Sequence, residues 1–192
     1  MNEEQAREQF ALHPEAFWRW VWEAFDLPLE HRYLLRSLGR GYRRSFVVEP
    51  DLDARTTLFG RIALWWLWTH PDSAVLWPEL DRAHEAEMTR VLSAAMLTSK
   101  QYAFRSAFSM GPGPVVFVRQ GRAEVARGVG ITADELAQMT AEDFSTRDVL
   151  LMFPDFDATP TPLVLELCGK MVSPRALIAG GTTLPHAQAK QT

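Results

Sequence analysis

Short apolar runs alternate with helical patterns along most of this chain. The runs are SFVV at 45–48, AVLW at 74–77, VVFV at 115–118, DVLLMF at 148–153 and ALIA at 176–179. Strands with almost no polar residue on either face are typical of a parallel sheet that helices cover on both sides. The sequence therefore predicts an α/β fold, a three-layer sandwich with a mainly parallel sheet of about five strands. We expect SFVV and DVLLMF to be adjacent central strands.

Helical patterns precede the first strand and fill the intervals between strands. One pattern covers 14–25, with Phe17, Val21 and Phe25 on one side, and others cover 29–39, about 54–68, 80–97 and 162–171. Thr132 is a suitable cap for a further short helix. A chain of 192 residues, 47% of them hydrophobic, is able to bury a full core. We expect a single domain over residues 1–183, with a helical lead-in over 1–42 and a flexible tail over 184–192.

The segment 54–68 is apolar on nearly all sides, which predicts a buried helix. Its residues Trp65, Trp66 and Trp68 cannot all face one core, because neighbouring side chains on a helix differ by about 100° in direction. At least one of them should meet another element or a partner. Cys168 is the only cysteine, so it has no second thiol for a disulfide or a metal site, and we expect it in the core.

Composition disfavours several classes of function. The net charge of −4 and the pI of about 5.7 argue against a broad surface that coats nucleic acid, although a local basic patch is compatible with them. The N-terminus is acidic, and the most apolar run, IALWWLW, is far shorter than the ~20 residues of a membrane span. We therefore expect a cytoplasmic protein without membrane contacts. The histidines have no metal-site spacing, and no G-x-S-x-G motif occurs; the histidines are at 13, 31, 70, 84 and 186.

The order of the motifs resembles one known family. The stretch from FWRWVWEAF at 17–25 through SFVVEPDLDARTTLFG, GVGIT, DVLLMFPDFD and PRALIAGGTT looks like the start of a tailed-phage terminase large subunit, the DNA-packaging motor, of the podovirus type. The resemblance covers about residues 14–183 and rests on the order and spacing of the motifs. It implies the RecA-like, P-loop type of ATPase fold, preceded by N-terminal helices, and a phage or mobile-element origin, which would place the protein in the host cell cytoplasm.

The resemblance places a degenerate P-loop after the first strand. Against the pattern G-x-x-x-x-G-K-[ST], the first glycine has become an acid, the second an alanine and the lysine an arginine; the aligned residues are Glu49, Pro50, Asp51, Leu52, Asp53, Ala54, Arg55 and Thr56. Phosphate binding needs inward backbone N–H groups and a positive interior. Pro50 lacks an N–H, and up to three acids oppose phosphate. The lysines, at 100, 170 and 190, do not replace the missing one. We expect no nucleotide or other cofactor here.

The other two ATPase motifs are also altered. A terminase strand of this kind ends in acids that hold Mg²⁺ and polarise water, whereas DVLLMF ends in Phe153 and Pro154, with Asp155 and Asp157 displaced onto the turn. These acids either cap the helix near residue 160 from a solvated turn or bind a metal, and we favour the solvated turn. ALIAGGTT is similar to the motif that senses γ-phosphate, with Thr182 at its polar position, although a glycine-rich strand exit is a sufficient explanation.

A basic group precedes the first strand and is a possible contact for phosphate or for an acidic partner. It consists of Arg36, Arg40, Arg43 and Arg44, with Tyr33 and Tyr42 nearby for stacking. A solvated helix face is the alternative interpretation.

These observations give three hypotheses. The first is a pseudo-ATPase without catalytic residues, metal or cofactor, which binds and inhibits or regulates another protein: a packaging-motor subunit, or a host defence complex such as a CRISPR effector. The second is a divergent Mg-dependent NTPase that uses Arg55 and Thr56, with Asp155 or Asp157 on the metal. The third is a DNA-binding module built on the arginine group.

Overall fold

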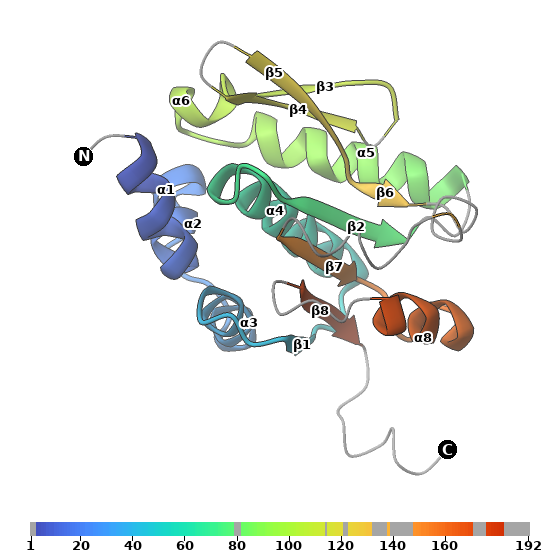
Figure 1. The fold of residues 1–192 in the computed structure, drawn as a ribbon. Helices are drawn as coiled ribbons and strands as arrows, with labels where there is room; N and C mark the ends of the chain where they lie inside the picture. The colour runs from blue at the N-terminus through green and yellow to red at the C-terminus, as the bar shows by residue number, and fades with distance from the viewer. Residues whose placement is uncertain are drawn as a thin grey trace.

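The computed structural model describes residues 3–78, 82–113, 115–120, 123–131, 138, 148–170 and 176–182. Its centre is a five-stranded sheet in the order β1-β8-β7-β2-β6, in which every neighbouring pair is parallel (Figure 1). The strands are β1 (Arg44–Val48), β2 (Ala74–Pro78), β6 (Gly130–Ile131), β7 (Val149–Phe153) and β8 (Ala176–Thr182). The predicted α/β class, with a parallel sheet of five strands and N-terminal helices, is confirmed.

The expected adjacency of SFVV and DVLLMF is wrong. β8 lies between β1 and β7 and pairs with both, so Phe46 and Phe153 each have Gly180 as their register partner. A Cβ on Gly180 would lie 2.3 Å from Phe46 Cε1, which explains why glycine stands there. SFVV is consequently an edge strand of this sheet. The apolar patterns could not reveal this order, because the crossover between two parallel strands is long enough to pass an intervening strand.

The run VVFV does not belong to the parallel sheet. It lies in β4 (Val115–Gln120), the middle strand of an antiparallel sheet with β3 (Phe108–Met110) and β5 (Ala123–Gly128). Two residues separate β4 from β5 in the sequence, and a connection this short joins antiparallel neighbours. The fifth parallel strand is instead the short β6, which pairs with β2.

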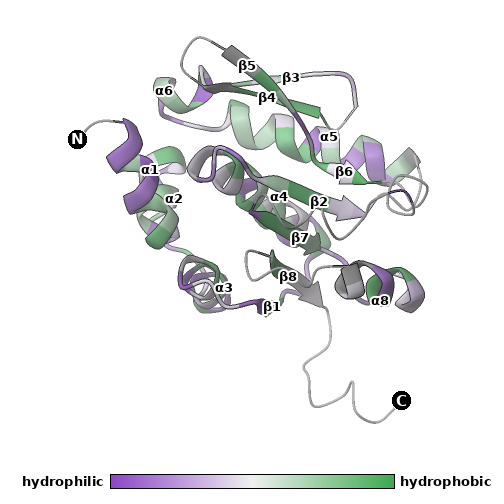
Figure 2. Ribbon diagram, viewed as in Figure 1, coloured by the Kyte–Doolittle hydropathy of each residue, from purple (hydrophilic) through white to green (hydrophobic). Residues whose placement is uncertain are grey.

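Helices cover both faces of the parallel sheet, as in the predicted three-layer sandwich. The helices are α1 (Glu3–Leu12), α2 (Pro14–Trp22), α3 (Leu29–Gly39), α4 (Leu52–Thr69), α5 (Arg82–Leu97), α6 (Tyr102–Arg105) and α8 (Thr161–Lys170). In β7, Leu150 and Met152 share a core with α1 to α6, whereas Leu151 on the opposite face packs with Leu163 and Val164 of α8. The central strands β2 and β7 are green in Figure 2, and α1 is largely purple.

Helix α4 is buried on nearly all sides, as predicted. Trp65, Trp66 and Trp68 are at most 5% exposed, and they meet different surroundings. Trp65 Nε1 donates to the carbonyl of Phe10 in α1 over 2.9 Å, Trp66 stacks on His70 at 3.8 Å, and Trp68 packs on the aromatic rings of α1 and α2. Other elements of the same chain therefore receive Trp65 and Trp68, whereas Trp66 packs on the residue that ends its own helix.

Helix α2 ends three residues earlier than the apolar spacing predicts. Its last residue is Trp22, because Glu23 adopts a left-handed conformation with φ of 51°. Phe25 then falls on the linker to α3 and is 66% exposed, so the prediction that it shares a helix face with Phe17 and Val21 is wrong.

Some expectations concern residues outside the described ranges. These are the helix that Thr132 was expected to cap, the tail over 184–192, and the side chain of Cys168. Within the described ranges, none of the helices has the length and apolarity that crossing a bilayer requires.

Candidate functional site

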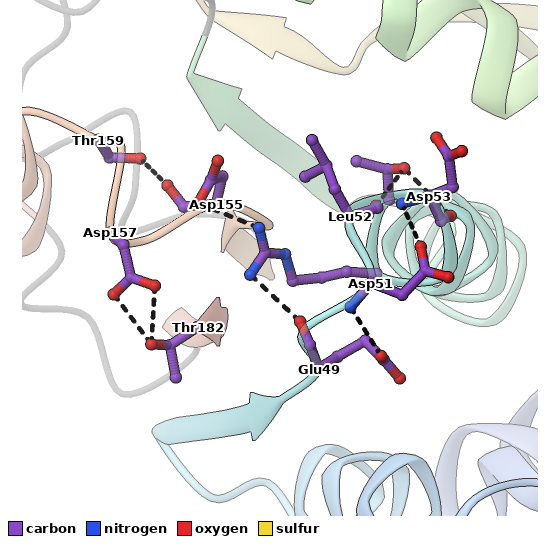
Figure 3. Close-up of polar contacts among 10 residues, drawn as sticks. Glu49, Asp51, Leu52, Asp53, Asp155, Asp157, Thr159 and Thr182 are labelled. Carbon is purple, nitrogen blue, oxygen red and sulfur yellow. Dashed lines mark hydrogen bonds and ion pairs between the residues drawn. The ribbon is translucent and has the colours of Figure 1, made fainter. Parts of the chain in front are cut away.

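Three sequence segments meet at one edge of the parallel sheet. Parallel strands place their carboxyl ends at the same edge, which is where ligands bind in open α/β sheets. The connection after β1, the turn after β7 and the end of β8 therefore come together, as Figure 3 shows for Glu49, Asp155 and Thr182. These are the three places to which the terminase resemblance assigns ATPase motifs.

The connection from β1 to α4 contains only three residues, Glu49, Pro50 and Asp51. Helix α4 starts before the predicted position at residue 54 because Asp51 caps it: the Asp51 carboxylate accepts hydrogen bonds from the N–H groups of Asp53 (2.9 Å) and Ala54 (3.1 Å). The residues aligned with the second half of the P-loop pattern are thus already helical. The segment keeps the position of a phosphate loop but not its length.

The N–H groups of this segment already have acceptors. That of Asp51 donates to Glu49 Oε1 (3.1 Å), that of Asp53 to the Asp51 carboxylate, and that of Arg55 to the Asp51 carbonyl (2.9 Å). Pro50 contributes no N–H. In a phosphate-binding loop such donors point at the anion. Here carboxylates of the chain take the anion's place, so the acids occupy the donors as well as repelling phosphate.

Arg55 is almost completely buried, with 1% of its surface exposed. Its Nη2 lies 3.2 Å from Asp155 Oδ1 in an ion pair, and its Nη1 donates to the Glu49 carbonyl over 3.3 Å. The aliphatic part of the side chain packs on β8, where a Cβ on Gly181 would lie 2.6 Å from Arg55 Cδ. Arg55 therefore joins the ends of β1, β7 and β8. The lysine of a P-loop reaches a phosphate, whereas this arginine reaches a carboxylate of its own chain.

The turn after β7, over residues 154–158, brings its two acids to different neighbours. Asp155 pairs with Arg55, and its backbone carbonyl accepts a hydrogen bond from Thr159 Oγ1 (2.8 Å). Both carboxylate oxygens of Asp157 lie 2.9 Å from Thr182 Oγ1, which donates to them. Thr182, which the resemblance placed at a γ-phosphate sensor, thus binds the Asp157 carboxylate.

Phe153 and the two glycines are explained by packing. Phe153, at the position where the resemblance expects an acid, is 1% exposed and meets Phe156 edge-on, with ring centroids 5.9 Å apart. Gly180 and Gly181 lie inside β8, so a glycine-rich strand exit is not the correct interpretation of this pair. A Cβ on Gly181 would also lie 2.7 Å from the carbonyl of Pro154.

A cavity of about 370 Å³ adjoins these contacts, between the start of α4 and the ends of β2 and β7. Trp77 and Phe153 form part of its apolar wall. Three acids, Asp53, Glu87 and Asp155, lie on its lining. An apolar wall with an acidic rim suits a neutral or cationic group better than a polyphosphate.

Arg90 on α5 partly balances this rim. Its Nε and Nη2 donate to the two carboxylate oxygens of Glu87 over 2.7 and 2.5 Å, and Nη2 lies 3.9 Å from Asp53 Oδ1. The hydrogen bond from Arg90 lowers the pKa of Glu87, so this carboxylate stays ionised at neutral pH.

Thr56, the one residue of the P-loop pattern that is retained, also lines the cavity. Its hydroxyl donates to the carbonyls of Leu52 (2.8 Å) and Asp53 (3.2 Å), inside the same helix. The hydroxyl thus makes its hydrogen bonds to the backbone of its own helix, as a threonine in any helix can.

Sequence reasoning missed one polar side-chain contact of the site. His31 Nε2 lies 2.9 Å from Glu49 Oε2, and only 10% and 17% of the two side chains are exposed. The residues are 18 positions apart, so no local spacing indicates the pair. The contact exists because α3 packs beside β1.

The arginines singled out in the sequence are divided between two places. Arg36 and Arg40, near the end of α3, line a groove of about 1000 Å³. Arg43 and Arg44 lie at the start of the edge strand β1 and do not line that groove. All four are exposed, as are the nearby side chains of Tyr33 and Tyr42, at 60% and 55%.

No group of three or more His, Cys, Asp or Glu side chains in the described ranges is arranged to hold a metal ion.

His70, at the end of α4, is stacked on Trp66, and its Nδ1 lies 2.9 Å from Thr69 Oγ1. Burial lowers the pKa of His70, although the charge of Asp148 and the Trp66 carbonyl act in the opposite direction.

The chain was compared with models of protein families, with curated proteins and with solved structures, and none of the three comparisons gives a match.

Proposed function

We propose that this chain is a pseudo-ATPase: a terminase-like, RecA-like domain of phage or mobile-element origin that acts by binding another protein instead of hydrolysing ATP. The observation that carries the proposal is the ion pair of the buried Arg55 with the partly exposed Asp155 at the carboxyl edge of the sheet. It occupies the junction of β1, β7 and β8, to which the resemblance assigns the phosphates and the metal.

Phosphate would have to displace several contacts at once. It would compete with Asp51 for the first N–H groups of α4 and with Asp155 for Arg55. Two unit charges about 5 Å apart interact by about 3 kcal/mol at an effective dielectric of 20, so one unpaired acid facing a phosphate lowers affinity by about two decades. Asp53, whose side chain is 91% exposed, lies on the cavity rim 3.9 Å from Arg90, which offsets part of this repulsion.

The kind of target follows from the resemblance. A domain that keeps the shape of a motor subunit without its chemistry suits a role as a subunit mimic, which would bind a packaging motor and stop it. A host defence complex, such as a CRISPR effector, is the other target we propose, because blocking a surface of such a complex also requires no catalysis.

One observation favours the divergent NTPase as the second candidate. Thr56 and Asp155 line the same cavity, as a metal-binding hydroxyl and carboxylate would in an NTPase. Against this, the Thr56 hydroxyl is bound to its own helix and Asp155 is bound to Arg55.

Calorimetry and a phosphate-release assay with Mg-ATP separate the two candidates. We expect no heat of binding at millimolar Mg-ATP and no turnover. The control variant is Thr56→Ala, which removes a hydroxyl that bonds only within α4 and should leave the fold intact. Turnover by the natural sequence that Thr56→Ala abolishes would overturn the proposal in favour of the NTPase.

A further inference from the structure

The groove between α2 and α3 shares no lining residue with the cavity at the sheet edge. It has a volume of about 1000 Å³ and lies where the start of α2 faces the end of α3. We call it the α2–α3 groove. Ligand pockets for small molecules reach about this volume at most, so an open groove of this size suits a peptide segment.

The lining of the groove is positively charged, although the chain carries a net charge of −4. Arg19, Arg36 and Arg40 line it, together with one acid, Glu15. Arg36 is already paired, with its Nε 2.5 Å from Glu15 Oε1. The guanidinium groups of Arg19 and Arg40 have no charged or hydrogen-bonded partner in the part of the chain that the structure describes. Two arginines are therefore available to external carboxylates.

The same groove exposes large apolar side chains. Phe25 is 66% exposed and Leu12 is 65% exposed, and both are lining residues. Trp20 also lines the groove, and its half-buried ring is held in place by stacking on Phe10, with ring centroids 5.2 Å apart. Aromatic residues and arginines side by side are typical of the energetically dominant part of a protein interface.

We propose that the α2–α3 groove binds a segment of a partner protein in which acidic residues flank one bulky apolar side chain. The carboxylates pair with Arg19 and Arg40, and the apolar side chain packs against Phe25 and Trp20. This inference rests on the proposed protein-binding function and specifies its surface and the chemistry of its partner.

Charge and shape favour a peptide over single-stranded nucleic acid. Stacking rings beside arginines also bind single strands, but a polyanion would approach a protein whose net charge is negative. Glu15 in the lining would further repel a phosphate backbone. A peptide needs only two carboxylates in place and gains from burying Phe25 and Leu12.

A display library of short random peptides, selected on the immobilised protein, tests the proposal. We expect the enriched peptides to carry acidic residues on both sides of Phe, Trp, Leu or Met. The double charge reversal Arg19→Glu/Arg40→Glu should weaken the best peptide about 10- to 100-fold in fluorescence anisotropy, and Phe25→Ser should weaken it about 10-fold. These side chains are exposed, so far-UV circular dichroism should be unchanged.

Matched variants outside the groove provide the controls. Arg105→Glu changes charge by the same amount per residue at the exposed end of α6, and Leu165→Ser removes an apolar side chain that is 67% exposed on α8. Both should leave peptide affinity within about twofold. A short oligothymidylate should not bind; binding that the double reversal abolishes would assign the groove to nucleic acid and overturn the proposal.

Two further outcomes would overturn it: no enrichment of acidic-apolar peptides, or enriched peptides that bind the groove variants as tightly as the natural sequence. In the second case the chain would still be a protein-binding domain, but through another surface. ATP turnover would contradict the proposed function, whereas the peptide results above contradict only the groove as the binding surface, so the two proposals can fail independently.

Discussion

Arg55 carries a positive charge in a nearly dry position, and its contacts join the ends of three strands. A buried guanidinium needs acceptors, which Asp155 and the Glu49 carbonyl supply. Its methylene groups fill the space above Gly181. Arg55 therefore helps to close the edge of the protein's own sheet.

This role makes Arg55 a stability determinant. We expect Asp155→Asn to lower the free energy of unfolding by about 2–3 kcal/mol, because it leaves the charge of Arg55, which is 1% exposed, without its anionic partner. Arg55→Met/Asp155→Asn should recover part of that loss, which a double-mutant cycle in urea would measure. Arg90→Met, in an exposed pair on the same cavity rim, should cause no measurable change. Equal losses for Asp155→Asn and Arg90→Met would contradict this assignment.

His70 determines in which direction the stability of the fold changes with pH. Burial lowers the pKa of His70 in the folded protein below its usual value of about 6.5. Between that lowered pKa and pH 6.5 the unfolded chain binds a proton that the folded chain does not, so unfolding becomes easier as the pH falls through this window. We expect stability to be flat above pH 7 and to decline below pH 6.5. The stability of His70→Phe should decline less over this window, because the variant lacks the group whose pKa burial lowers. Identical slopes in urea titrations of the two proteins would refute this.

At the scale of elements, β8 explains why two glycines stand together in a strand. Gly180 leaves room for Phe46 of β1, and Gly181 leaves room for Arg55 and for the Pro154 carbonyl. A similar close approach joins α4 to α5, where a Cβ on Gly60 would lie 2.2 Å from Val91 Cγ1. Each glycine marks a place where two elements approach more closely than a side chain allows.

Gly181→Ala should therefore destabilise the protein by about 1–3 kcal/mol, because its Cβ would meet a backbone carbonyl that cannot rotate away. Gly169→Ala is the matched control: it lies in α8 with no atom within 4 Å of the new Cβ, so better helix propensity should raise stability by about 0.5–1 kcal/mol. Thermal unfolding of both variants checks the pair. A Gly181→Ala variant as stable as the natural sequence would show that β8 can shift away from the carbonyl of Pro154.

The helices and strands themselves were largely predictable from the sequence, but which elements lie beside one another in the fold was not. The run DVLLMF and the all-round apolar pattern of 54–68 indicate a buried strand and a buried helix because burial requires apolar side chains wherever an element is covered. That β8 inserts beside β1 depends on contacts between residues more than a hundred positions apart, such as Phe46 and Gly180. Likewise, two separate motifs of the terminase resemblance drew attention to Arg55 and to Asp155, but the pairing of these residues depends on strand order.

At the scale of the whole molecule, the N-terminal helices belong to the main core and are not merely a lead-in. Phe10, Phe17 and Leu35 from α1, α2 and α3 share one buried cluster with α4 and the sheet. Phe10 also receives the Trp65 indole N–H on its backbone carbonyl. Helix α4 is apolar on nearly all sides, and α1 and α2 cover part of it, while α5 packs on another part.

Removing α1 should consequently affect the entire fold. Deleting residues 1–12 would expose Trp65 and Trp68 and leave the Trp65 indole N–H without its acceptor. Truncating the single side chain in Phe10→Ala should already cost about 3 kcal/mol, and the deletion should cost more, which is enough to unfold a domain of ordinary stability. Deleting residues 184–192, the tail expected to be flexible, should leave the urea midpoint unchanged. Tryptophan fluorescence distinguishes the outcomes, because solvent-exposed indoles emit at longer wavelength. If the 1–12 deletion unfolded at the same midpoint with unshifted emission, the N-terminal helices would be an appendage, and the covering role assigned here to α1 would be incorrect.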